Sequence, residues 1–512
     1  MSNWLKSAIF YEIYPNSYMD LNGDGYGDLK GITSKLDYIK SLGANAIWLN
    51  PHYDSPFMDG GYDVRDYFKV SPRFGTEADF DEFISTAHAK GLRVILDLVP
   101  GHTSEQNPDF LKSAEPVRNE LYDRFIWTSH EWQFPEGFKA ISGRHNRKGN
   151  YIVNYYSTQP SLNYGFNNIT EPDWQMPYTS DAAKATREWL KSVIRFWLNR
   201  GADGFRVDMA DSLVKNDGSQ SEKPATSEIW RDIRAMLDSE YPDAVLVSEW
   251  SNPQAIRAGF HADFMLDHHG NPYNMLVRHE EAGKHSYFDI EGRGDGAAFA
   301  KGFTEWYEAI KDKGNIAIIS CNHDTPRLAP FYSHDQLKAI YTTLFTLPGV
   351  PFMYYGDEIG MKYKKDLPSV ECGFGRTGSR TPMQWNTQKN AGFSSADRTF
   401  LPAETDKTVN AEAQLKDKNS LLNFVKSLFE FRKSRKELCS NDFEFVHAAG
   451  AEPLVFRRGI LTVVVNPLAV KQTVAAEISQ KAKPVFCAGK EAKPNKNGTV
   501  TVPPVSVTVF EN

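Results

Sequence analysis

Short apolar runs alternate with amphipathic stretches along most of this 512-residue chain, and this alternation constrains the fold more than any other feature of the sequence. The apolar runs predict eight buried strands, which begin at residues 8, 46, 92, 203, 244, 263, 315 and 350. Helical periodicity lies between them, for example at 32–41, 80–90 and 183–200, and a glycine follows each of these stretches within two residues. Eight strands joined through helices predict an α/β fold of the parallel (β/α)8 TIM-barrel type.

Two segments depart from this alternation. Residues 103–175 are rich in Trp, Tyr, Asn and Gly and show no helical period, which indicates a long insertion after the third strand. After about residue 438 the apolar residues recur at every second position, which is typical of antiparallel strands. We therefore predict a catalytic barrel at 1–102 and 176–437, an inserted domain at 103–175, and a C-terminal antiparallel β-domain at 438–512.

Composition narrows the class of partner. The chain carries 58 basic and 65 acidic residues, a net charge of −7, which argues against a nucleic-acid surface and for a small neutral or cationic substrate. The four cysteines have no paired spacing, so neither a disulfide framework nor a zinc site is expected. The sequence shows no signal-peptide pattern and no membrane-length apolar run. We expect a cytoplasmic protein with no membrane partner; its oligomeric state stays open.

Acidic side chains stand where predicted strands end, and active sites of this barrel form at that rim. Arg206 and Asp208 are two residues apart and would share one face, so the guanidinium would hold the carboxylate ionised as a nucleophile. Glu249 ends the fifth strand and Asp324 follows the seventh. Enzymes that hydrolyse glycosides typically use a pair of carboxyl groups. The alternative for each is a structural salt bridge or a polar loop residue. Other polar side chains at the rim are Tyr62, Asp63, His102 and His323.

The loop from Asp20 to Asp28 has a second kind of signature. Oxygen-bearing side chains fall at every second position, with Asn22 and Asp24 between the two ends and glycines that let the loop curl. The spacing of these side chains matches that of the ligands in the first part of a calcium-binding loop. Gly31 stands where an EF-hand has its glutamate, so the motif is incomplete. We predict a structural Ca²⁺ here, although Mg²⁺ fits as well, and a simple polar turn is the alternative.

Specific motifs connect these features to a known family. They are DLVPGH at 97–102, GFRVD at 204–208, SEW at 248–250, CNHDTPR at 321–327, YYGDEIGM at 354–361 and RTPMQW at 380–385. With them, nearly the whole chain resembles the α-amylase family of retaining glycoside hydrolases, on its α-glucosidase, oligo-1,6-glucosidase and trehalose synthase branch.

The resemblance implies a role for each matching residue. Asp208 would be the nucleophile, Glu249 the acid/base, and Asp324 the stabiliser of the transition state. The residues implied in binding the sugar are Tyr62, Asp63, His102, Arg206, His323 and Arg380. Among them, Asp63 and Arg380 would grip the non-reducing end of the substrate. The metal loop would use Asp20, Asn22, Asp24, Asp28 and the carbonyl of Tyr26.

Two departures from the family pattern matter. Gly101 replaces the usual asparagine before His102, and Ser161 replaces the usual aspartate of the insertion motif, so we predict no calcium site between barrel and insertion. The resemblance implies an exo-acting α-glucosidase that hydrolyses α-glucosidic bonds of short oligosaccharides through a covalent β-glycosyl-aspartate intermediate. The alternative is an α-glucosyl transferase such as a trehalose synthase. A third reading, a non-catalytic binding subunit, is opposed by the intact catalytic trio. The preferred linkage stays open.

Overall fold

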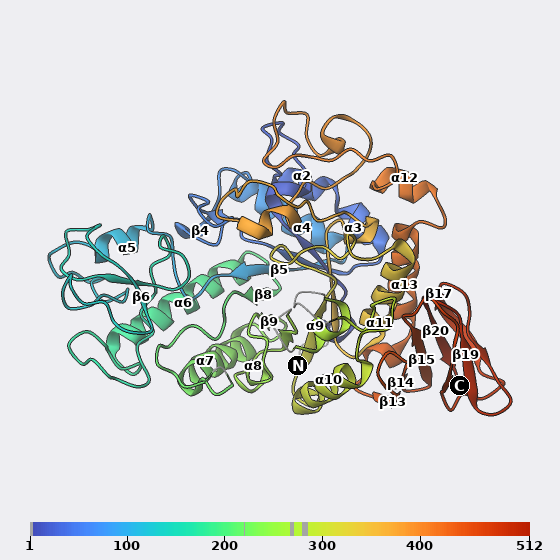
Figure 1. Ribbon diagram of the computed structural model, residues 1–512. Helices are drawn as coiled ribbons and strands as arrows, with labels where there is room; N and C mark the ends of the chain where they lie inside the picture. The colour runs from blue at the N-terminus through green and yellow to red at the C-terminus, as the bar shows by residue number, and fades with distance from the viewer. Residues whose placement is uncertain (1–3, 220, 267–270, 279–284) are drawn as a thin grey trace.

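The computed structural model describes residues 4–219, 221–266, 271–278 and 285–512 (Figure 1). All eight predicted barrel strands are confirmed, and they pair in parallel into one closed barrel in the ring order β1-β12-β11-β10-β9-β8-β5-β2. The ring closes because Phe10 pairs with Ala46 on one side and with Phe352 on the other. The strands are β1 (Phe10–Ile13), β2 (Ala46–Leu49), β5 (Arg93–Leu98), β8 (Gly204–Val207), β9 (Val245–Ser248), β10 (Ala262–Phe264), β11 (Asn315–Ile319) and β12 (Val350–Tyr354).

Helices surround this barrel, as the amphipathic periodicity predicts. Two of them begin with a capping box, in which Thr76 pairs with Asp79 and Ser333 with Gln336. One stretch differs from the prediction, because residues 32–41 are divided between two short helices that meet at Lys35. The outer helices are α2 (Leu29–Ser34), α3 (Leu36–Leu42), α4 (Glu77–Ala89), α6 (Asp181–Asn199), α7 (Pro224–Glu240), α8 (Gln254–Arg257), α9 (Pro272–Val277), α10 (Gly296–Ile310), α11 (His334–Thr346), α12 (Ala411–Lys416) and α13 (Leu421–Ser434).

The segment after β5 leaves the barrel and forms a separate lobe, drawn at the left of Figure 1. It contains α5 (Pro108–Ser113) and the antiparallel pair β6 (Lys139–Ile141) and β7 (Tyr151–Val153). A small apolar cluster of its own includes Ile126, Ile152, Phe166 and Trp174. A bridge between His102 and Ser161 joins the lobe to the end of the third barrel strand. The boundaries of this insertion at 103 and 175 stay a prediction.

The C-terminal part forms the antiparallel β-domain that the period-2 pattern predicts, at the right of Figure 1. One sheet has the order β13-β14-β15-β20-β17 and a second the order β16-β19-β18. Arg458 is fully buried and donates to the carbonyl of Thr346 at the end of α11, which fixes the domain to the barrel. The strands are β13 (Glu444–His447), β14 (Leu454–Arg458), β15 (Leu461–Asn466), β16 (Gln472–Ala475), β17 (Lys483–Ala488), β18 (Lys493–Pro494), β19 (Thr499–Val502) and β20 (Ser506–Glu511).

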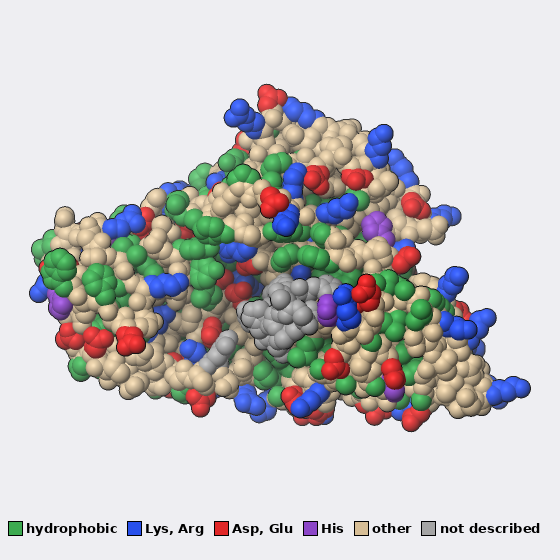
Figure 2. All heavy atoms as spheres, viewed as in Figure 1, with side chains coloured by type: hydrophobic (Ala, Val, Ile, Leu, Met, Phe, Trp, Pro, Cys, Tyr) green, Lys and Arg blue, Asp and Glu red, His purple; other side chains and the backbone are tan. Residues whose placement is uncertain are grey.

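The surface carries charges of both signs. On the face shown in Figure 2, basic and acidic side chains are interspersed and do not form one continuous basic surface. Within the described residues, no helix has both the length and the apolar character that a membrane crossing requires. All four cysteines are free thiols: Cys321 is buried, Cys487 is exposed, and Cys372 and Cys439 lie between these extremes.

Candidate active site

A cavity of about 240 Å³ opens at the rim where the barrel strands end. Five of the residues singled out in the sequence line it, namely Tyr62, His102, Asp208, Glu249 and Asp324. Four further residues complete its wall: Asp59, Tyr155, Met209 and Arg376. The carboxylates therefore converge as expected, because parallel strands place their carboxyl ends at one edge of the barrel.

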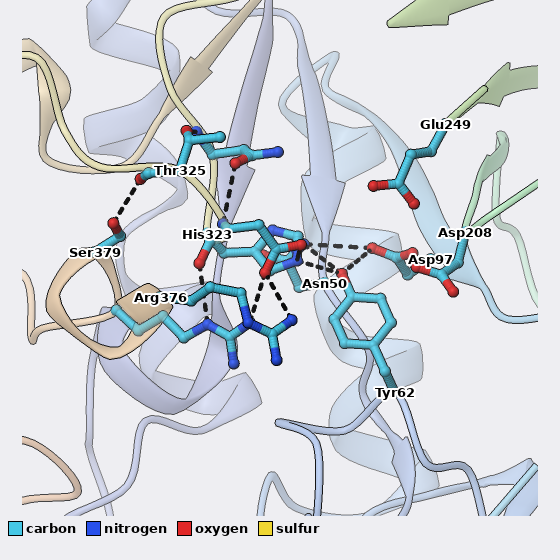
Figure 3. A network of polar contacts seen from close by, with 12 residues as sticks. Asn50, Tyr62, Asp97, Asp208, Glu249, His323, Thr325, Arg376 and Ser379 are labelled. Atoms are coloured by element: carbon cyan, nitrogen blue, oxygen red, sulfur yellow. Dashed lines mark hydrogen bonds and ion pairs between the residues drawn. The ribbon is translucent and has the colours of Figure 1, made fainter. Parts of the chain in front are cut away.

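Arg206 is the fully buried centre of the charged cluster. Its Nη1 lies 2.6 Å from Asp97 Oδ1 and 3.0 Å from Asp208 Oδ1, and its Nη2 lies 2.8 Å from Glu249 Oε2. Strands β5 and β8 are in register at Asp97 and Arg206, which brings these two side chains together. Figure 3 shows the carboxyl groups of Asp97, Asp208 and Glu249 on the same side of the site.

One guanidinium facing three carboxylates leaves an excess of negative charge. Burial and the neighbouring Glu249 raise the pKa of Asp208 well above its ordinary value, and Arg206 lowers it by a smaller amount. The sequence leads us to expect an ionised Asp208, but Arg206 is shared among three acids and cannot achieve this alone. The pKa of Asp208 is therefore raised although Arg206 contacts it, because burial and the carboxyl group of Glu249 outweigh the guanidinium.

Asp324 lies on the opposite wall and is held by two arginines. Its Oδ1 is 2.7 Å from Arg380 Nη2 and 3.2 Å from Arg376 Nη1. Burial raises the pKa of Asp324, but His323, Arg376 and Arg380 outweigh burial and lower it well below its ordinary value. Burial also lowers the pKa of His323 well below 6.5, so that imidazole is neutral. We therefore assign the ionisation of Asp324 to the two guanidinium groups.

His323 lies behind the cavity wall, although the resemblance implies a direct contact with the sugar. It is fully buried, and its Nε2 lies 2.7 Å from the hydroxyl of Tyr62 and 3.3 Å from Asp324 Oδ2 (Figure 3). Its Nδ1 lies 2.8 Å from Glu12 Oε1. The rings of His323 and Tyr62 are stacked with their centroids 5.3 Å apart. In this structure His323 therefore orients two residues that line the cavity.

His102 reaches the cavity and connects the barrel with the insertion. Its Nε2 lies 3.1 Å from the carbonyl of Tyr62, and its Nδ1 lies 3.2 Å from the amide of Asn154. Burial lowers the pKa of His102 to about 4, so it is neutral at pH 7. Lys215 donates to Asn154 Oδ1 at 2.8 Å and to the carbonyl of Ser212 at 2.7 Å.

The contact between His102 and Asn154 explains why a glycine stands at position 101. A Cβ at position 101 would come within 2.7 Å of Asn154 Nδ2 and 2.8 Å of Ser212 Oγ. Any side chain there would displace the amide that meets His102.

The expected contact of Asp63 and Arg380 with the non-reducing end of the substrate needs a correction. Asp63 is fully buried behind the wall, where its carboxylate accepts the backbone N–H groups of Met58 at 2.9 Å and Asp59 at 3.0 Å. Arg380 is almost fully buried and donates to the carbonyl of His323 as well as to Asp324. Both residues shape the wall from behind.

Asp59 and Arg376 stand at the cavity in their place. Arg376 Nη2 lies 2.8 Å from Asp59 Oδ1, and Gln159 of the insertion donates to Asp59 Oδ2 at 2.8 Å. The sequence offered only a weak signal for them: Asp59 precedes Tyr62 by three residues, and Arg376 precedes Arg380 by four.

The predicted metal loop is closed by its own hydrogen bonds. Asp28 accepts the N–H groups of Leu21, Asn22 and Gly31, and Asp20 accepts those of Gly23 and Gly25. Its oxygen donors are the type that Ca²⁺ prefers. In the described parts of the chain, however, no three acidic, His or Cys side chains are gathered as a metal site. A bound Ca²⁺ or Mg²⁺ stays a prediction.

Comparison with known proteins adds independent information. Residues 12–441 match the protein family described as alpha amylase, catalytic domain. The chain is 32% identical to the trehalose synthase/amylase TreS of Mycolicibacterium smegmatis over 90% of this chain and 81% of that protein. It is 31% identical to the probable oligo-1,6-glucosidase 3 of Bacillus subtilis, over 86% of each. A solved structure of Bacillus licheniformis trehalose-6-phosphate hydrolase superposes with a TM-score of 0.80 at 26% identity, covering 99% of both chains.

Proposed function

This chain belongs to the α-amylase family, and from that premise we propose that it is a retaining, exo-acting α-glucosidase of short oligosaccharides. Relatives named α-glucosidase, oligo-1,6-glucosidase and trehalose synthase support an enzyme that hydrolyses or transfers α-glucosyl groups. The observation that carries the proposal is the pair of acids, Asp208 and Glu249, held by the single guanidinium of Arg206 at one wall of the cavity.

The proposed mechanism has two displacements. In the first, the Asp208 carboxylate attacks the anomeric carbon while Glu249 donates its proton to the departing glycosidic oxygen, which forms a β-glucosyl ester. In the second, Glu249 takes a proton from water, the water oxygen attacks the same carbon, and Asp208 leaves as a carboxylate. Asp324 is ionised and stands on the opposite wall, where it can accept hydrogen bonds from sugar hydroxyls as positive charge develops on the ring.

Exo action is supported by contacts within the cavity wall. The Asp59–Arg376 ion pair and the Arg376–Asp324 contact join three residues of the wall, and Gln159 of the insertion donates a hydrogen bond to Asp59. Arg376 has a side-chain exposure of 19%, so its guanidinium is largely committed to these partners. We propose that these joined residues close the cavity behind one terminal sugar ring and leave the rest of the substrate outside.

The test is the product pattern from maltotetraose labelled at its reducing end. An exo-acting, retaining enzyme releases unlabelled glucose as the α-anomer, seen by NMR before mutarotation, and leaves labelled maltotriose. Labelled glucose or maltose as a first product would refute exo action, and β-glucose would refute retention. Asp59→Ala should lower kcat/KM for the tetraose, with Glu82→Ala, on the exposed face of α4, as a control.

A second candidate, an intramolecular glucosyl transferase, is favoured by the match to a trehalose synthase. The same acids would serve it, with the released sugar as acceptor in place of water. Incubation with maltose or trehalose separates the two: a new disaccharide with little free glucose supports the transferase, and glucose accumulation supports the hydrolase.

We further propose that the loop from Asp20 to Asp28 binds Ca²⁺ through Asp20, Asn22, Asp24, Asp28 and the carbonyl of Tyr26. The alternating oxygen donors support this assignment. A bound cation would neutralise the carboxylates of the loop. No step of the reaction depends on it.

A further inference from the structure

Asp263 is a buried carboxylate that the mechanism above does not use. It lies on β10 and is fully buried, and strand pairing places it directly beside Ser248 of β9. Ser248 immediately precedes Glu249 in the chain. Asp263 does not line the cavity, so its influence on the reaction can only pass through its neighbours.

The carboxylate of Asp263 binds the chain on both sides of Glu249. Its Oδ1 accepts hydrogen bonds from Ser248 Oγ at 2.6 Å and from the backbone N–H of Trp250 at 3.1 Å and of Ser251 at 3.3 Å. Its Oδ2 accepts the N–H of Asn252 at 2.8 Å. One side chain thus fixes four of the five residues from 248 to 252, all except Glu249 itself.

The turn held in this way is strained. Ser251 has a φ of 56°, a left-handed conformation that is unfavourable for a residue with a side chain. A second set of contacts holds the same residue, since Ser251 Oγ accepts from the N–H of Leu266 at 3.3 Å and from Asn271 Nδ2 at 3.1 Å. A strained turn persists only where its surroundings fix it, and Asp263 accepts four hydrogen bonds from residues 248–252.

The other side of Glu249 is anchored to β8. The N–H of Glu249 donates to the carbonyl of Val207 at 3.0 Å, and the N–H of Met209 donates to Glu249 Oε2 at 3.0 Å. The acid is therefore held between the loop after β8 and the turn that Asp263 fixes. A shift of the turn would move the Glu249 carboxyl group relative to Asp208.

Burying this carboxylate is unfavourable. Burial raises the pKa of Asp263 to about 7, even though its four hydrogen-bond donors lower it. An apolar residue would fill the same space without this cost. A carboxyl group at this position is explained if its oxygen atoms are needed to accept the hydrogen bonds that hold the 248–252 turn.

We propose that Asp263 is a positioning residue for Glu249, whose carboxylate fixes the 248–252 turn so that the acid points at the departing glycosidic oxygen. This inference rests on the acid/base role proposed for Glu249. It predicts a specific kinetic signature, because a displaced acid harms only substrates whose leaving group needs a proton.

The experiment uses Asp263→Asn in the full-length protein. The amide keeps one oxygen acceptor and turns an N–H group toward the N–H of Asn252, so the turn loses one contact and gains a repulsive one. We expect kcat/KM for maltose to fall roughly 10- to 100-fold, a part of the 10²- to 10⁴-fold that general acid catalysis provides. For 4-nitrophenyl α-glucoside, whose leaving group departs with little protonation, we expect a loss of no more than about threefold.

Two further variants make the result decisive. Asp217→Asn is the matched control: Asp217 is also buried and accepts two backbone N–H groups, at 3.0 and 2.7 Å, but at the start of α7. It should lower the melting temperature without changing the maltose-to-aryl ratio. If Asp263→Asn does not fold, Ser248→Ala removes the 2.6 Å contact with Asp263 and a longer one of 3.3 Å with the carbonyl of Ala262, and it should shift the ratio in the same direction by a smaller factor.

Equal losses on both substrates, or none, would overturn the role of Asp263. Glu249→Gln is the reference that separates this failure from failure of the proposed function. If Glu249→Gln shows the selective loss and Asp263→Asn does not, only the positioning role is wrong. If Glu249→Gln also loses both substrates equally, the acid/base assignment is wrong, and the inference fails with it.

Discussion

Replacement of Arg206 by lysine is the perturbation that the charged cluster predicts most sharply. The guanidinium reaches Asp97 and Asp208 through one nitrogen and Glu249 through the other, at 2.6, 3.0 and 2.8 Å. A single ammonium cannot occupy both nitrogen positions, so at least one contact to the catalytic pair is lost. A hydrogen bond to a charged group contributes about 1.5–3 kcal/mol. At about 1.4 kcal/mol per tenfold, kcat/KM should fall roughly 10- to 150-fold.

The assay is kcat/KM on 4-nitrophenyl α-glucoside as a function of pH, together with the melting temperature. Because Arg206 lowers the pKa of Asp208, the lysine variant should also lose activity at a higher pH than the wild type as the solution is acidified. The control is Arg195→Lys, a partly exposed arginine with two contacts of 2.7 Å to Glu240, which should leave activity unchanged. Activity within about twofold of wild type, with an unmoved acid limb, would refute the reasoning.

Three further predictions follow from the same site and from the loop beside it. Glu249→Gln should slow maltose by roughly 10²- to 10⁴-fold and aryl glucosides far less, and equal losses would contradict its acid role. In the wild type, Asp208 reacts only as a carboxylate and its pKa is raised, so kcat/KM should decline on acidification at a pH above the ordinary aspartate pKa of about 3.9; a decline centred below that value would contradict the raised pKa of Asp208. Chelation by EDTA should lower the melting temperature by a few degrees, with recovery on adding Ca²⁺ and no such response in Asp20→Asn; an unchanged melting temperature would exclude the cation.

The barrel could be predicted because most of its strands are short and largely apolar runs. Parallel strands covered by helices on the outside are buried on both faces, and this leaves an apolar signal although charged residues such as Arg206 and Asp263 stand within some of the strands. The break at Lys35 was not predictable from periodicity, because the apolar positions continue across it.

The acids at strand ends could be predicted for a topological reason, and the loop residues could not. Asp208 and Glu249 follow their strands directly, so the barrel alone brings them to the rim. Asp59 and Asp63 share one loop, and which of them faces the cavity depends on the backbone N–H groups that Asp63 accepts. Arg376 follows a segment with three left-handed residues that no periodic pattern describes: Glu371, Cys372 and Phe374.

The positions behind the wall depend on packing across the barrel. His323 stacks on Tyr62 and meets Glu12, a residue more than 300 positions away in the chain. The motif around His323 indicated a polar residue at the rim, and only the packed structure shows that it lies behind the cavity wall. The same holds for Asp263, whose partners all lie on the neighbouring strand and turn.

The central claim is that Asp208 carries the sugar during the reaction, and trapping the intermediate tests it most directly. The protein is incubated with 5-fluoro-α-D-glucosyl fluoride, whose ring fluorine slows the second displacement, then digested and analysed by mass spectrometry. The account predicts one fluoroglucosyl group on the peptide that contains Asp208, and no such adduct in Asp208→Asn. A stable adduct on Glu249 or Asp324, or turnover of the reagent by Asp208→Asn at the wild-type rate, would contradict it.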